Sequence, residues 1–165
     1  MLKLVARARP DAQVDAELAL AFESRQRSRL LTALADGEPV TLLLERGSVL
    51  RGGDRLAADD GRIVRIVAAD EDVMDASSAD PLVLVRVVYH LGNRHARVEI
   101  GARSVRFAAD PVLATMARGL GAEVVARRAP FEPEAGAYAA GHHHHSGEAK
   151  HAGIIHEMLA QSRRG

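Results

Sequence analysis

The sequence contains no cysteine and no tryptophan, and only 3% of its 165 residues are aromatic. Without thiols the chain can form no disulfide framework, no thiolate zinc site and no iron–sulfur cluster. Because disulfides are rare in reducing compartments, this absence fits a cytoplasmic protein. A packed core is still expected, since 47% of the residues are hydrophobic. Alanine, valine and leucine must supply most of that core.

The sequence also has no excess of charge of either sign and no long hydrophobic run. Twenty-two basic residues balance 22 acidic ones, whereas nucleic-acid binding normally requires a basic surplus. The longest nearly apolar stretch, residues 81–88, is interrupted by Arg86 and is far shorter than the ~20 residues of a membrane span. The apolar stretch within the first ten residues is too short for the hydrophobic region of a signal peptide. We therefore expect neither nucleic acid nor membrane as a partner.

Residues 1–70 predict a small all-β domain. Short apolar segments alternate with glycine- and aspartate-rich turns, a pattern typical of many short strands and without a clear helix. This half contains no histidine and no cysteine, so it cannot hold a Ser/His/Asp or Cys/His catalytic set. The expected strands include residues 2–5, 30–34, 40–44 and 62–67.

The acidic stretch 70–72 marks a predicted boundary, and residues 71–130 predict a βαββαβ domain. Asp80-Pro81 and Asp110-Pro111 each combine an N-cap residue with proline at the first helical position. Together with the flanking alternating segments, these signals indicate an α+β protein whose second domain is ferredoxin-like. The expected elements are a strand at 73–76, a helix at 82–91, a hairpin at 96–100 and 103–107, a helix at 111–120 and a strand at 123–127.

Residues 131–165 predict a mobile C-terminal tail. From Pro130 onward, prolines and glycines punctuate the sequence, as is typical of segments that cannot bury a core. Residues 148–160 could form a short amphipathic helix, but 13 residues are marginal for an isolated helix.

The clearest chemical signal is the run of four histidines His142, His143, His144 and His145. Neighbouring neutral imidazoles can share one divalent ion, and imidazole suits zinc, copper and nickel. The alternative is an affinity tag, although twenty residues follow the run. His151 and His156 add two further candidate ligands, but on a helix they would lie ~140° apart and could not bind one ion together. For those two, solvated tail histidines are an equally good interpretation.

Two further histidines lie in the segment Tyr89-His90-Leu91-Gly92-Asn93-Arg94-His95. His90 falls at the expected helix end, where histidine stabilises the terminal carbonyls, and we prefer this structural role for it. His95 is expected at the start of the next strand. One imidazole per chain makes a poor metal site, but a two-fold axis near His95 would bring two together.

Four segments of the chain resemble the UreE family of urease accessory proteins. They are YHLGNRH (89–95), PFEPEAGAY (130–138), LLLERGSVLRGGDRL (42–56) and the histidine-rich tail. The resemblance covers essentially the whole chain. It implies a homodimeric nickel metallochaperone that passes Ni(II) to a urease accessory GTPase and the urease apoprotein complex. It further implies a peptide-binding-like N-terminal domain and a C-terminal domain that dimerises.

The same resemblance assigns roles to individual histidines. His95, the last residue of the YHLGNRH motif, corresponds to the interfacial metal ligand, one from each subunit, and the tail histidines complete or extend that site. Some relatives carry further histidines near the start of the second helix of this domain. This chain has Phe107-Ala108-Ala109-Asp110-Pro111 there, so that peripheral site should be missing.

Two other functions remain open from the residues alone. A metal-dependent hydrolase would need three fixed ligands, an open position and a general base, and the only carboxylate next to a histidine is Glu157. We therefore expect a protein that is not an enzyme. A protein-binding accessory module, in which the histidines only buffer divalent metal, is the second. The residues indicate a borderline divalent ion, so Zn(II) or Cu(II) could replace Ni(II), which comes from the resemblance.

Overall fold

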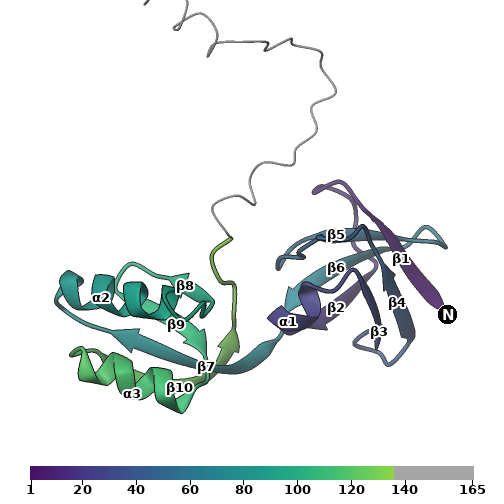
Figure 1. Ribbon diagram of the computed structural model, residues 1–165. Helices are drawn as coiled ribbons and strands as arrows, with labels where there is room; N and C mark the ends of the chain where they lie inside the picture. The colour runs from purple at the N-terminus through teal and green to yellow at the C-terminus, as the bar shows by residue number, and fades with distance from the viewer. Residues whose placement is uncertain (136–165) are drawn as a thin grey trace, which may run out of the picture. The chain divides into compact units, whose positions relative to one another are not determined.

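A computed structural model describes residues 1–135, which contain two separate β-sheets (Figure 1). The first is six-stranded, with the spatial order β2-β6-β5-β1-β4-β3. Its neighbours are antiparallel except for the parallel pairs β1/β4 and β2/β6. The strands are β1 (Leu2–Arg7), β2 (Ala16–Leu20), β3 (Arg29–Ala33), β4 (Pro39–Leu43), β5 (Arg55–Ala58) and β6 (Ile63–Ala68).

The sheet of residues 1–68 encloses its own core. Leu18 on edge strand β2 and Leu42 on β4, near the other edge, belong to the same buried cluster. The Ala35 amide, just after edge strand β3, donates to the Glu17 carbonyl of β2 (3.4 Å), so the sheet curls and its two edges approach each other. Successive side chains on a strand alternate between faces. Accordingly Val64 and Ile66 are fully buried while Arg65 between them is exposed.

The sequence prediction for this first half was incomplete. The expected segments at 2–5, 30–34, 40–44 and 62–67 all fall on strands, but strands β2 and β5 were missed. A single helical turn, α1 (Phe22–Arg25), also occurs where no helix was expected. It is too short to show helical periodicity. Its last residue, Arg25, is completely buried.

The second sheet has four antiparallel strands in the order β10-β7-β9-β8. The order strand–helix–strand–strand–helix–strand agrees with the sequence prediction. Residues 70–72, the predicted boundary, form the first part of strand β7. The elements are β7 (Asp70–Ser77), α2 (Pro81–Gly92), β8 (Val98–Ile100), β9 (Ser104–Ala108), α3 (Pro111–Gly119) and β10 (Glu123–Pro130).

Both helices begin at the aspartate–proline pairs that predicted them. The Asp80 side chain accepts a hydrogen bond from the Leu82 amide (2.9 Å), and that of Asp110 accepts from Val112 and Leu113 (2.7 and 3.0 Å). These bonds satisfy amide groups that have no partner within the helix. The helices pack on one face of the sheet, where Val87 and Leu91 of α2 join Phe107 of β9 in one buried cluster.

The start of the predicted tail is packed, contrary to its loose composition. Phe131 is only 2% exposed and lies against Phe22 and Val73. The composition of this segment does not predict the packing of Phe131, because a single buried ring with polar neighbours leaves no periodic pattern. No helix among residues 1–135 is long and apolar enough to cross a membrane.

Candidate metal centre

His95 lies in the turn that ends helix α2, not at the start of a strand as the sequence predicted. Strand β8 begins only at Val98. The His95 amide donates to the Gly92 carbonyl (2.9 Å), and the Ala96 amide donates to the Leu91 carbonyl (3.1 Å). This pair of bonds is the Schellman motif, which places His95 at the left-handed position after the helix. The sequence suggested Gly92 as the stop signal, but Gly92 is still helical.

The backbone of His95 is strained. Its φ is 55°, and among residues 1–135 it is the only non-glycine residue with positive φ. A side chain in this region costs about 1–2 kcal/mol relative to the right-handed conformation, and glycine usually occupies this position of the motif. The imidazole is also exposed. A strained residue where glycine would fit more easily points to a side chain kept for its function.

His90 lies in the last turn of α2, as predicted, and is half-buried. Its ring packs edge-on against the ring of Tyr89, with centroids 5.3 Å apart. Its carbonyl oxygen accepts a hydrogen bond from the Arg94 guanidinium (3.3 Å). It is therefore the Arg94 guanidinium that binds a terminal carbonyl of α2, and the role that we preferred for the His90 side chain stays a prediction.

The described part of one chain does not supply a complete metal site. Within residues 1–135, no three histidine, aspartate or glutamate side chains come together in a group that could hold an ion. His95 therefore offers a single donor. The other predicted ligands, His142 to His145, His151 and His156, lie outside the described residues. A metal ion at His95 would need further donors, which a second copy of the chain or residues beyond 135 could supply.

Helix α2 leads to His95 along an exposed apolar stripe. Leu82, Val85 and Tyr89 are 62%, 63% and 64% exposed, and their spacing places them on one face of the helix. The opposite face carries Val87 and Leu91, which are fully buried. A row of large apolar side chains in solvent is typical of a protein-interaction surface.

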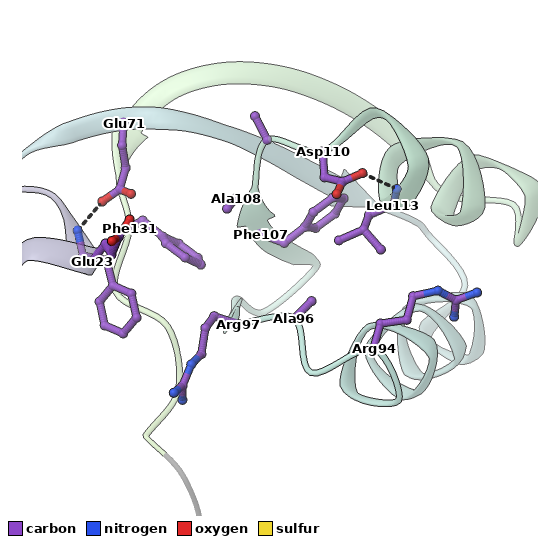
Figure 2. A pocket seen from close by; sticks show the side chains of 12 residues that line it. Glu23, Glu71, Arg94, Ala96, Arg97, Phe107, Ala108, Asp110, Leu113 and Phe131 are labelled. Atoms are coloured by element: carbon purple, nitrogen blue, oxygen red, sulfur yellow. Dashed lines mark hydrogen bonds between the residues drawn. The ribbon is translucent and has the colours of Figure 1, made fainter. Parts of the chain in front are cut away.

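A pocket of about 410 Å³ lies beside the His95 turn, with Arg94 and Ala96 in its wall (Figure 2). Two of its carboxylates are bound to backbone amides: Glu71 accepts from Phe22 (2.7 Å), and Asp110 caps α3. The third, Glu23, accepts from the Arg27 guanidinium (2.9 Å). Ala108 and Ala109 also line the pocket. This is the region where the resemblance suggested peripheral histidines in relatives, and methyl groups offer no donor there.

The fold and this site define a class of protein. It has a sheet-rich N-terminal part and an α/β C-terminal part, and it presents one strained, exposed histidine after a helix with an uncovered apolar face.

Family comparison matches the same two parts. The UreE urease accessory protein N-terminal domain matches residues 2–69, and the C-terminal domain of the same family matches residues 71–157. The chain therefore belongs to the UreE family of urease accessory proteins.

Individual relatives agree with this membership. A urease accessory protein UreE from Nitrosospira multiformis is 49% identical over 97% of this chain and 90% of its own length. Proteins of the same name from Burkholderia orbicola and Burkholderia vietnamiensis are each 57% identical over 77% of this chain. The matches cover 62% and 64% of those two relatives, so the chain spans less than two thirds of their length.

Proposed function

We propose that this protein is a nickel metallochaperone that carries Ni(II) to the urease metallocentre during assembly. The observation that carries the proposal is His95, an exposed imidazole held in a left-handed turn where glycine would be less strained. Family membership supports nickel as the cargo. Imidazole also suits Zn(II) and Cu(II), which would compete for the same site.

The functional unit is a homodimer formed through residues 71–129. Each chain contributes one imidazole, and a two-fold axis next to the His95 turn would double that number. The stripe of Leu82, Val85 and Tyr89 supports this arrangement, because an uncovered apolar helix face gains free energy when a second copy covers it. The element order and the strand order β10-β7-β9-β8 support the classification of this domain as ferredoxin-like.

The chain that connects Glu134 to the tail histidines is long enough for them to reach His95. The Glu134 amide donates to the Val98 carbonyl (2.7 Å), and Val98 is three residues from His95, or at most about 10 Å. From Glu134 to His142 the chain is eight residues long and spans at most about 28 Å when extended. We propose that His142 to His145, with His151 and His156, act from the tail as ligands that leave one at a time.

Delivery requires partners that accept the ion. We propose a urease accessory GTPase and the urease apoprotein complex, and we place the exchange in the cytoplasm, where GTP is available. Metal held by imidazole is released by protonation. Because free histidine titrates near ~6.5, Ni(II) should be lost as the pH falls from about 6.5 to 5.

The alternative is a protein-binding accessory module in which the histidines only buffer metal. Activation of a urease apoprotein separates the two, with wild type and His95→Ala compared at equal protein and limiting nickel. A carrier predicts that His95→Ala activates less, whereas a module predicts equal activation. Equal activation would therefore refute the carrier proposal.

The dimer has its own test. Val85→Asp places a charge in the apolar stripe and should shift the protein toward monomer in sedimentation at micromolar concentration. Val112→Asp is the matched control, because Val112 is 73% exposed on α3. A wild type that sediments as a monomer with and without Ni(II) would refute the dimer.

A further inference from the structure

The Arg25 side chain of α1 is completely buried, and each of its three nitrogens donates a hydrogen bond. Its Nε donates to the Leu20 carbonyl (3.1 Å), its Nη1 to Glu132 Oε1 (2.6 Å) and its Nη2 to the Phe131 carbonyl. The guanidinium also lies over the Phe22 ring, 5.3 Å from its centroid. A buried charge is expensive unless it is paired in this way. Arg25 therefore ties residues 131 and 132, which follow strand β10, to residues of the first sheet.

The Glu132 carboxylate accepts two further hydrogen bonds. Its Oε1 also accepts from the Gly52 amide (2.7 Å), and its Oε2 accepts from Arg51 Nη1 (3.2 Å). Arg51 donates in addition to the Pro133 carbonyl (2.6 Å). We call residues 131–134, together with Arg25 and Arg51, the clasp.

Residues 130–134 cross the second sheet from one edge to the other. Strands β10 and β8 are the two edges of this sheet, three strand spacings or about 14 Å apart. Arg106 of β9 donates to the Pro130 carbonyl (2.9 Å), and the Glu132 amide donates to Glu99 of β8 (2.7 Å). At Glu134 the chain reaches the Val98 carbonyl. Within four residues the chain thus moves from the edge far from His95 to the strand that follows His95.

We propose that the clasp is a positioning device that fixes the starting point of the histidine-bearing tail next to the His95 turn. Glu132 is its central positioning residue and is not itself a metal ligand. This inference rests on the proposed nickel-binding function. Its consequence is a higher effective concentration of the tail imidazoles around an ion held by His95.

The size of the effect on Ni(II) affinity depends on the number of residues between the fixed backbone and His142, and on where the fixed backbone ends. With the clasp closed, eight residues separate fixed backbone at Glu134 from His142. With the clasp open, the fixed backbone ends at Pro130, so twelve residues intervene and the start moves by up to about 14 Å. Effective concentration falls with both linker length and distance. We expect a loss of about two- to fivefold in Ni(II) affinity.

The experiment compares four full-length proteins: wild type, Glu132→Ala, a variant with all six tail histidines changed to alanine, and the combination. The affinity for the tightest Ni(II) ion is measured by competition with a chelator. We expect Glu132→Ala to weaken binding in the wild-type background and to have no effect where the tail histidines are absent. A purely structural role for Glu132 would weaken binding equally in both backgrounds, and that result would overturn the inference.

Two other outcomes also decide the question. If Glu132→Ala keeps the full tail-dependent affinity, the clasp inference fails while the proposed function stands. If removal of the tail histidines leaves wild-type affinity unchanged, the ligand role of the tail in the proposed function fails and the clasp inference fails with it. Should Glu132→Ala not fold, Arg51→Ala tests the same prediction, since Arg51 is 33% exposed and binds both Glu132 and Pro133.

Discussion

Replacing His95 by glycine should make the metal-free protein more stable while removing the proposed primary metal ligand. His95 has φ 55°, where a residue with a Cβ atom costs about 1–2 kcal/mol. Glycine removes that cost but loses more conformational freedom on folding, by about 0.4–1 kcal/mol. Because the imidazole is exposed, little packing is lost. The net expectation is a gain of about 0.5–1 kcal/mol.

Thermal unfolding of the metal-free protein in the presence of a chelator measures this gain. For a chain of this length we expect a rise in Tm of about 1–4 °C. Circular dichroism is the suitable probe, because the chain has no tryptophan. His95→Ala is the matched control, since alanine keeps the Cβ atom and the strain, and its Tm should stay near that of wild type. A His95→Gly protein that is no more stable than His95→Ala would refute the argument that the turn is strained.

Three further predictions concern the clasp. Arg25→Ala should destabilise the protein by about 2–5 kcal/mol in urea unfolding because it removes a completely buried side chain and leaves the Leu20 and Phe131 carbonyls without their donor. Arg27→Ala is the control, because it breaks only an exposed pair with Glu23 and should cost about 0–0.5 kcal/mol. Equal urea midpoints for the two variants would contradict the prediction for Arg25. Gly52→Ala brings a Cβ atom to 2.9 Å from Glu132 Oε1 and should destabilise by about 1–3 kcal/mol. Gly119→Ala meets no atom within 4 Å and should be neutral or stabilising in the same assay. Burial raises the pKa of Glu132, but hydrogen bonds from Gly52, Arg25 and Arg51 outweigh it and leave the pKa below the ordinary 4.5. The stability that depends on this lowered pKa is thus present above pH 4.5 and lost as the pH falls through the lowered value. Glu132→Gln should flatten the acid limb of the stability–pH curve, and an unchanged limb would argue against this pairing.

The second domain was more predictable from the sequence than the first because its signals are local. Asp80-Pro81 and Asp110-Pro111 each place a cap and a proline at the helix start, and both helices begin there. In the first domain the missed strand β2 pairs in parallel with β6, which lies more than forty residues away in the chain. Such a pairing leaves no turn signal next to the strand.

The choice of His95 as a candidate ligand stays a prediction, and the geometry of its turn was not predictable from the sequence. The sequence analysis selected His95 but predicted it at the start of a strand, because Gly92 resembled the residue that ends the helix. The Schellman turn instead places a histidine where glycine is usual. The clasp was missed for a different reason. Glu132 acquires its partners Arg25 and Arg51 only through contacts between residues about 80 to 107 positions apart, and no spacing in the sequence records them.

The central claim is that His95 supplies the primary nickel site and that the tail adds capacity. Equilibrium dialysis of the full-length protein against Ni(II) tests it most directly, with wild type, His95→Ala and a chain truncated after Gly141 compared at pH 7.5. Wild type should bind one tight ion per dimer plus weaker ions. His95→Ala should lose the tight ion, and the truncated chain should keep it with reduced affinity and lower total capacity. If the truncated chain lost all tight binding and His95→Ala kept it, the primary site would lie in the tail and the claim would be wrong.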